Sequence, residues 1–285
     1  MKKPLPIGIS DYKTLIEDDY YYVDKTLFIK ELLQVGGGVA LICRPRRFGK
    51  TLNLSMLYYF FEKTAISNEH LFVDKAIWQD EKSRSLQGQF PVIFITFKDV
   101  KETTWEAAKK KIIELIAKEY KRHQEFIESH LALINRNDVE IFNSIVMGDG
   151  KDVHVSSSLH FLSSLLEQIA NKRVILLLDE YDAPMHAAYV NGYYDQMIAF
   201  MQPFLSAGLK DNKHLSRAVL TGILRTAKEG VFSGLNNLNV CTLLHDSFAD
   251  KFGFVSQEVD TLLLNQGIIH EAQVIKDWYN GYHAG

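Results

Sequence analysis

Apolar residues along the chain gather into short continuous runs that alternate with longer segments of helical spacing. Four runs have the length and composition of strands that are buried on both faces of a sheet: Val39 to Cys43, Val92 to Phe97, Val174 to Leu178 and Ala218 to Ile223. Strands that alternate with helices are typical of parallel sheets joined by right-handed crossovers. The pattern therefore predicts an α/β fold with a doubly wound, mainly parallel sheet.

The segments between and beyond these runs predict helices. Apolar residues recur at helical spacing in a segment that begins near Asp24, and then in Thr51 to Phe61, Trp105 to Ile116, Ser156 to Ala170, Tyr193 to Leu209, Gln257 to Leu264 and His270 to Tyr279. We expect an approach segment at 1–35, a core at 36–230 and a small helical C-terminal segment at 231–285. The periodicity weakens at about 123–155, which we interpret as an insertion in the core.

Composition places the chain among ordinary globular proteins, with 47% hydrophobic and 24% charged residues in 285. A net charge of −3 gives no broad basic surface for nucleic acid, and the run Lys109 to Lys111 reads as a solvated helix face. The cysteines, Cys43 and Cys241, and the histidines lack the spacing of metal sites. No stretch resembles a signal peptide or a membrane span, so we expect a cytoplasmic protein without a membrane partner.

The stretch from Val39 to Thr51 reads VALICRPRRFGKT, a strand that enters a turn and then a helix through Gly49, Lys50 and Thr51. This is the layout of a phosphate-binding P-loop, because loop N–H groups and a helix N-terminus both favour an anion. The usual pattern has glycine where this chain has Arg44. Pro45 holds position 44 in the extended region, so glycine is not required there.

In such a loop the lysine ammonium contacts the β- and γ-phosphates and the adjacent hydroxyl binds Mg²⁺, which are the roles predicted for Lys50 and Thr51. The alternative is a chance GKT in an ordinary turn. Arg44, Arg46 and Arg47 either reach over the phosphates or form surface or structural ion pairs, and the sequence leaves both interpretations open.

Two later strands end in polar residues that suit the same chemistry. Asp179 and Glu180 follow a buried strand, where the first carboxylate can hold Mg²⁺ and the second can activate a water. Thr221 ends another strand and Arg225 follows it, so the hydroxyl could orient the attacking water and the guanidinium could stabilise phosphate charge. The structural alternatives are a solvated acidic turn, a strand-terminal hydroxyl and a surface cation. Asp182 either forms a turn or supplies a carboxylate that supports the metal-binding residues without contacting the metal.

Motifs along the whole chain resemble those of the bacterial AAA-ATPase-like proteins, in which a P-loop ATPase region is commonly followed by a PD-(D/E)xK-type nuclease-like region. The matching segments start at Leu5 (LPIGI), Tyr22 (YVDKT), Arg44 (RPRRFGKT), Leu178 (LDEYD), Thr221 (TGI), Phe232 (FSGLNNL), Phe252 (FGF) and Trp278 (WYNGY).

The resemblance implies that Lys50 and Thr51 bind phosphate and Mg²⁺. We expect Mg²⁺ to be held by Thr51 and Asp179, and the nucleotide by Arg46, Arg47, Phe48, Gly49, Lys50, Thr51 and Asp179. The resemblance makes Asp179 and Glu180 the Walker B pair, Thr221 the sensor position, and Arg44 a normal member of the loop. It also suggests that the motif at Tyr22 lies near the adenine pocket, and it assigns no chemical role to Asn236 and Asn237.

Two departures qualify the resemblance. Asp179 follows Lys50 by 129 residues, more than in compact AAA+ modules, which favours a relation to signal-transduction-type ATPases of the additional-strand, catalytic-glutamate kind. The chain ends soon after Trp278, so we expect the nuclease-like region to be absent. Nucleic acid would then be a partner only through that missing region.

The sequence thus predicts a Mg-dependent ATPase that binds ATP and acts as a switch or motor for an attached effector, with self-association as a further expectation. A nucleotide-binding switch with negligible turnover is the first alternative. A phosphotransferase is the second, although the Asp179 and Glu180 pair favours water as the acceptor.

Overall fold

Five parallel strands form the single sheet of this protein in the computed structural model, which describes residues 2–36, 38–223, 232 and 237–279. The strands are β1 (Val39–Cys43), β2 (Val92–Thr96), β3 (Val174–Asp179), β4 (Leu215–Gly222) and β5 (Leu238–Cys241). Their order is β2-β3-β4-β1-β5, and every pairing is parallel. The predicted α/β fold with a parallel sheet is confirmed, and β4 separates β1 from β3.

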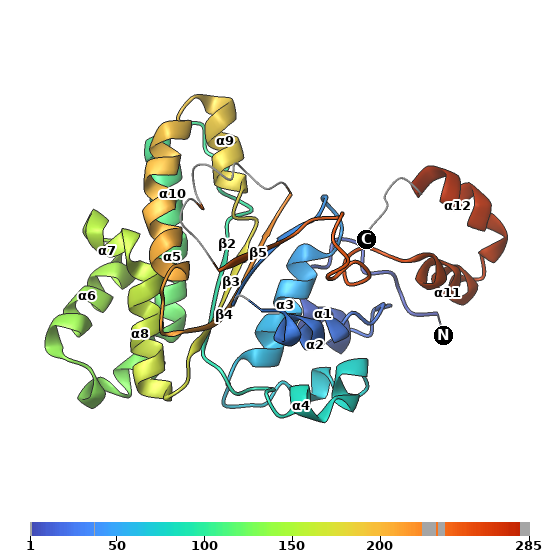
Figure 1. The fold of residues 1–285 in the computed structure, drawn as a ribbon, viewed down its shortest axis with the longest axis horizontal. Helices are drawn as coiled ribbons and strands as arrows, with labels where there is room; N and C mark the ends of the chain where they lie inside the picture. Colours follow the sequence, from blue (N-terminus) through green and yellow to red (C-terminus); the bar gives the residue numbers. More distant parts are fainter. Residues whose placement is uncertain (1, 37, 224–231, 233–236, 280–285) are drawn as a thin grey trace.

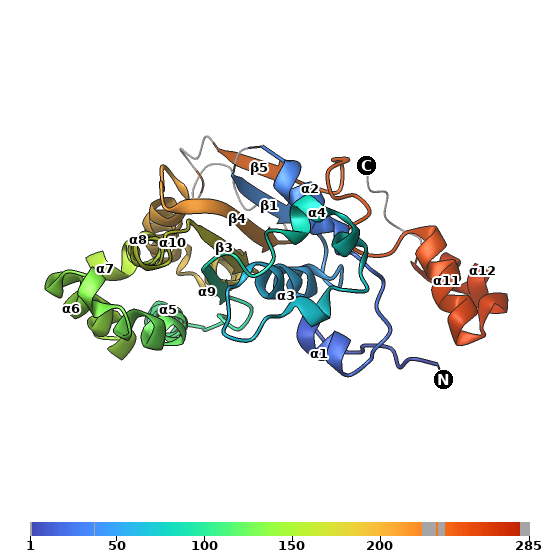
Figure 2. The same cartoon turned by 90° about the horizontal axis from the view of Figure 1, so that it is seen from below.

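Helices cover both faces of the sheet (Figures 1 and 2). One face carries α1 (Tyr12–Glu17), α2 (Leu27–Gln34), α3 (Lys50–Phe61) and α4 (Glu81–Arg84). The other carries α5 (Trp105–Glu128), α8 (Ser158–Ala170), α9 (Ala183–Asn191) and α10 (Tyr194–Leu209). Side chains alternate across the sheet, so Leu41 packs in one core and Ile42 in the other. This double burial explains the continuous apolar runs in the sequence.

The region expected to be an insertion is mostly helical. Helix α5 continues to Glu128, and α6 (Arg136–Met147) and α7 (Asp152–Ser156) follow it on the outer side of the α5 layer (Figure 1). Asn135 caps α6 by accepting a hydrogen bond from the Asp138 N–H at 2.9 Å, and Phe142 and Ile145 bury its apolar side. The weak periodicity of this stretch did not predict α6, although Asn135 caps the helix.

The strand β5 was not expected, because the sequence after Phe232 read as a loop followed by helices. Only Cys241 of its four residues is buried, so no apolar run marks it. It forms the sheet edge beside β1, with Ile42 opposite Cys241. The expected division of the chain at residues 35, 230 and 231 stays a prediction.

The other sheet edge, β2, is covered by side chains of α5. Glu119 accepts a hydrogen bond from the Phe94 N–H at 2.9 Å, and Arg122 donates to the Val92 carbonyl and to Glu62. Arg122 also pairs with Glu119 at 3.0 Å. These side chains satisfy main-chain groups that an edge strand otherwise leaves open.

Two helices predicted at the C-terminal end are present, α11 (Ser256–Gln266) and α12 (Ala272–Tyr279). They lie to the side of the α/β body (Figure 1). Lys25 joins α11 to the N-terminal segment through an ion pair with Glu258 at 2.5 Å. The short 3₁₀ helices of the chain are Glu69–Leu71, Ala76–Gln79, Leu131–Leu133 and Ile269–Glu271.

Candidate functional site

The phosphate-loop stretch leaves β1 at Cys43 and enters α3 at Lys50. Gly49 adopts a φ of 77°, while a Cβ placed on it would meet no atom within 4 Å. Its backbone conformation, not lack of space, therefore favours glycine. The first N–H groups of a helix have no partner within the helix, so the start of α3 offers donors for an anion.

Lys50 is buried at this helix start, with 5% of its surface exposed. Its ammonium donates to the carbonyl oxygens of Arg44 at 3.0 Å and Pro45 at 2.9 Å. Burial lowers the pKa of Lys50, and the nearby Glu180 and Asp179 carboxylates oppose that effect. The cation is thus held inside the loop and next to the acidic end of β3.

Asp179 at the end of β3 is fully buried and accepts hydrogen bonds from three hydroxyl groups. Its Oδ2 accepts hydrogen bonds from Thr51 at 2.9 Å and Thr96 at 3.1 Å, and its Oδ1 accepts one from Thr221 at 2.7 Å. The donors come from α3, β2 and β4. The structure therefore brings Thr51, Asp179 and Thr221 together, as the sequence predicted.

Thr96 is a member of this cluster that sequence reasoning missed. It ends β2 directly opposite Asp179 in the sheet register. The available signal was its position: Thr96 is the hydroxyl residue at the carboxyl end of an otherwise apolar run, as Thr221 is near the carboxyl end of β4. Carboxyl ends of parallel strands meet at one edge, which is where ligands of such sheets bind.

Glu180 lies next to the cluster in a conformation that is uncommon for a non-glycine residue, with φ 49°. Its N–H donates to the Thr221 hydroxyl at 3.3 Å. Burial raises the pKa of Glu180, the charges of Asp179 and Asp182 raise it further, and Lys50 lowers it. A half-buried carboxylate with a raised pKa is suited to accept a proton.

Asp182 and Gly222 fix the turn beside Glu180. The Asp182 carboxylate accepts a hydrogen bond from the Ile223 N–H at 2.8 Å, so it ties the end of β4 to the start of α9. A Cβ on Gly222 would lie 2.7 Å from the Tyr181 ring and 3.1 Å from Asp182. Glycine is required here by close packing.

The arginines of the loop lie in different surroundings. Arg46 and Arg47 are exposed, and the charge of Arg46 contributes to lowering the pKa of Lys50. Arg44 is fully buried and does not reach over the loop; it donates to main-chain carbonyls. Arg225 lies outside the described residues.

The motif that starts at Tyr22 forms structural ties. The Tyr22 hydroxyl accepts a hydrogen bond from the Lys25 N–H at 3.1 Å, and Asp24 accepts from Thr26 and from the Ala76 N–H at 2.7 Å. Asp24 therefore ties the segment before α2 to the loop at Ala76. A place near an adenine pocket stays a prediction.

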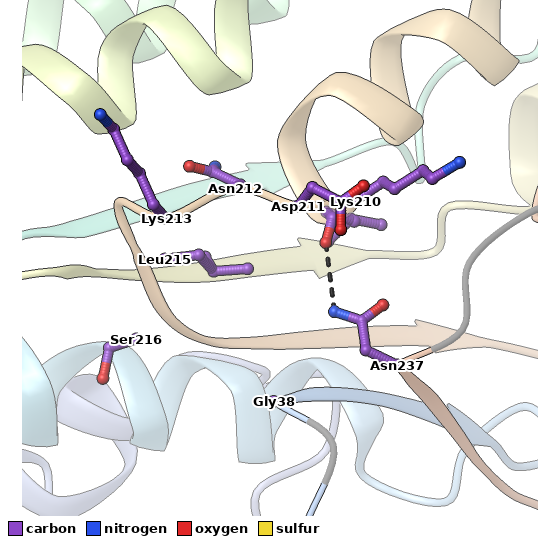
Figure 3. A pocket seen from close by; sticks show the side chains of 9 residues that line it. Gly38, Lys210, Asp211, Asn212, Lys213, Leu215, Ser216 and Asn237 are labelled. Carbon is purple, nitrogen blue, oxygen red and sulfur yellow. Dashed lines mark hydrogen bonds between the residues drawn. The ribbon is translucent and has the colours of Figure 1, made fainter.

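A separate pocket of about 430 Å³ lies at the amino ends of β1 and β4, away from this edge of the sheet (Figure 3). The Asn237 amide donates to the Leu209 carbonyl at 3.3 Å there. The pocket is lined by Gly38, Leu209, Lys210, Asp211, Asn212, Lys213, Leu215, Ser216 and Asn237. Asn237 thus has a structural contact, and Asn236 lies outside the described residues.

The oxygen atoms around Asp179 are suitable ligands for Mg²⁺. This ion prefers hard oxygen ligands and is commonly held by one or two protein groups together with substrate phosphates. The Thr51 hydroxyl and the Asp179 carboxylate, 2.9 Å apart, provide such oxygens. Within the described ranges, no group of three or more His, Cys, Asp and Glu side chains forms a metal cage.

These features define the class of the protein: the chain belongs to the family described as "Predicted AAA-ATPase", whose model matches residues 6–232. The chain is also 28% identical over 287 residues to a protein of Azotobacter chroococcum mcd 1 named "Uncharacterized protein in vnfD 5'region". That match covers 99% of this chain and 49% of the relative, so the chain spans about half the length of the relative. The family supports nucleotide binding and ATPase activity as the class of function.

No helix among the described residues combines the length and the apolar character that crossing a bilayer requires.

Proposed function

We propose that this chain binds ATP with Mg²⁺ at the carboxyl edge of its sheet and hydrolyses it. One observation carries the proposal: hydroxyls from α3, β2 and β4 converge on the buried Asp179 carboxylate, beside Lys50 and Glu180. In this proposal Lys50 supplies a cation at the start of α3, the oxygens of Thr51 and Asp179 are ligands for Mg²⁺, and Glu180 is a proton acceptor beside them. Those are the components that phosphoryl transfer to water requires.

In this proposal the loop from Arg46 to Gly49 and the start of α3 cradle the phosphates. Lys50 turns its ammonium from the loop carbonyls toward the β- and γ-phosphates. Thr51 and Asp179 hold Mg²⁺, which neutralises phosphate charge when it is bound. Asp179 is oriented for this task by Thr96 and Thr221.

Glu180 is the proposed general base. Its side chain follows Asp179 at the end of β3, and its raised pKa keeps it a stronger proton acceptor than an exposed carboxylate. The Thr221 hydroxyl donates a hydrogen bond to Asp179 and accepts one from the Glu180 N–H, so it sets the relative position of the two acidic residues. The place of β4 between β1 and β3 supports the additional-strand, catalytic-glutamate type of P-loop domain.

We further propose that ATP turnover drives a switch or motor function for an attached effector in the cytoplasm, with Arg225 or a neighbouring subunit stabilising phosphate charge. The alternative that best fits the exposed Arg46 and Arg47 is a nucleotide-binding switch, in which these side chains clamp phosphate without turnover. A phosphotransferase would require an acceptor hydroxyl in place of water.

ATP affinity and phosphate release from the purified full chain test the proposal. Lys50→Ala should weaken ATP binding, and Glu180→Gln should retain binding and lose phosphate release. Lys82→Ala and Glu114→Gln serve as matched controls, because both side chains are exposed and remote from the site in sequence. Equal phosphate release in the wild type and all four variants would refute hydrolysis at this site. Tight binding without release would favour the switch, and phosphate transfer to an added hydroxyl compound would favour the phosphotransferase.

A further inference from the structure

Arg44 is a buried cation at the first position of the phosphate loop. Its Nη1 donates to the carbonyl oxygens of Cys43 at 3.0 Å and Cys241 at 2.9 Å. Its Nη2 donates to the carbonyls of Phe248 at 3.3 Å and Ser247 at 3.5 Å. The guanidinium also lies over the Phe252 ring, 5.5 Å from the ring centre.

The partners of this guanidinium are main-chain dipoles and an aromatic ring, and no carboxylate of the described residues pairs with it. Burial of an unpaired charge is costly, and it lowers the pKa of Arg44. An anion bound at the adjoining loop would offset this cost, because charges interact strongly where water is excluded.

Arg44 and two other residues of the loop region hold the segment from Thr242 to Gly253, which we call the strap. The Asn53 amide in α3 donates to the Lys251 carbonyl at 2.8 Å. The Gly253 N–H donates to the Phe48 carbonyl at 3.1 Å, and a Cβ on Gly253 would lie 3.0 Å from the Phe48 ring. The strap is thus attached to the loop and to the first turn of α3.

The main chain of Arg44 connects the same point to the proposed active site. Its N–H donates to the Gly222 carbonyl at the end of β4 at 3.1 Å, and its carbonyl accepts from the Lys50 ammonium at 3.0 Å. A single residue therefore contacts the lysine proposed to bind phosphate through its main chain and the strap through its side chain. The strap leads directly into α11 (Figure 2).

We propose that Arg44 is a positioning residue that couples the phosphate loop to the strap, so that nucleotide binding holds the strap in place and the held strap strengthens nucleotide binding. The coupling rests on the proposed nucleotide site. It is reciprocal, because a nucleotide that binds more tightly when the strap is attached also favours the attached strap by the same free energy. It gives the attached α11 and α12 a structural connection to the nucleotide state.

Amide hydrogen exchange of strap peptides in the full chain, with and without Mg²⁺ and a non-hydrolysable ATP analogue, measures this coupling. In the wild type the analogue should slow exchange of the strap. Arg44→Lys keeps the charge and loses the forked donor. It should therefore abolish this slowing and weaken analogue binding by about 5- to 150-fold, the range of a typical coupling energy.

Arg217→Lys is the matched control. The Arg217 guanidinium likewise donates to two main-chain carbonyls, those of Val35 at 2.9 Å and Leu33 at 3.2 Å, and burial lowers its pKa as well. It lies near the opposite end of the sheet, so its replacement should leave analogue affinity and strap slowing at wild-type values. Asn53→Ala removes a different strap contact and should also reduce the slowing, which tests the proposal even where Arg44→Lys does not fold.

Two outcomes would overturn the coupling alone. One is analogue binding to the wild type with unchanged exchange of the strap, and the other is an equal loss of affinity in Arg44→Lys and Arg217→Lys. Absence of analogue binding to the wild type would overturn the proposed function together with the coupling, which separates the two failures.

Discussion

Replacement of Thr221 by valine removes one buried hydroxyl and preserves the shape of the side chain. The hydroxyl donates to Asp179 at 2.7 Å and accepts from the Glu180 N–H at 3.3 Å. Both partners then lose a hydrogen bond, and the surroundings leave little room for water because Thr221 and Asp179 are fully buried. We therefore expect Thr221→Val to destabilise the fold.

The magnitude follows from these two contacts. A hydrogen bond to a charged group contributes roughly 1.5 to 3 kcal/mol, and a bond between neutral groups contributes roughly 0.5 to 1.5 kcal/mol. Asp179 keeps its bonds from Thr51 and Thr96, so the loss should fall in the lower part of the summed range, about 2 to 3 kcal/mol. With an unfolding entropy of roughly 2.1 cal/mol/K per residue, or about 0.6 kcal/mol/K for 285 residues, this loss corresponds to a fall in the melting temperature of about 3 to 5 °C.

Thermal and urea unfolding of the purified variants provide the assay. Thr221→Ser is the control, because it keeps the hydroxyl and loses one methyl group, which costs about 1 kcal/mol. The valine variant should unfold below the serine variant. A valine variant as stable as the serine variant, or more stable, would refute the assigned hydrogen bonds at Asp179.

Three further predictions follow from the site and the sheet edge. Glu180→Gln should be more stable than the wild type at pH values above the raised pKa of Glu180, because the fold disfavours the charged carboxylate. This gain in stability should vanish below about pH 4.5, where the carboxyl is protonated in both the folded and the unfolded state. Urea unfolding at several pH values measures the difference, and a difference that does not change with pH would contradict the prediction. Gly222→Ala should cost about 1 to 3 kcal/mol by thermal unfolding, because its Cβ would overlap the Tyr181 ring, and wild-type stability would contradict that packing. Glu119→Gln should cost about 2 to 4 kcal/mol in urea unfolding, because it removes one of the two carboxylates that pair with Arg122 and leaves only Glu62. A loss under about 1 kcal/mol would contradict the role assigned to Glu119 and Arg122 at the β2 edge.

Much of the sheet could be predicted from sequence because burial on both faces produces continuous apolar runs. Strand β1 has the predicted bounds, Val39 to Cys43, and β2 to β4 differ from prediction only at their ends. The edge strand β5 could not be found in this way, since it is short and mostly half-buried. Its identity depends on pairing with β1, which is a long-range property.

The cluster at Asp179 was predictable in part. Strand ends that meet at one edge indicated Asp179 and Thr221, but only the register with β2 adds Thr96. The burial of Arg44 depends on β5 and the strap, which lie about 200 residues further along the chain, so the sequence could not assign its partners. The roles of the assembled residues stay predictions.

The most direct test of the central claim is steady-state phosphate release by Glu180→Gln, measured with its ATP affinity. The proposed mechanism predicts ATP affinity close to that of the wild type and release at least about 100-fold slower, the contribution expected of a general base. Phosphate release at the wild-type rate by Glu180→Gln would contradict the assignment of this site as an ATPase centre.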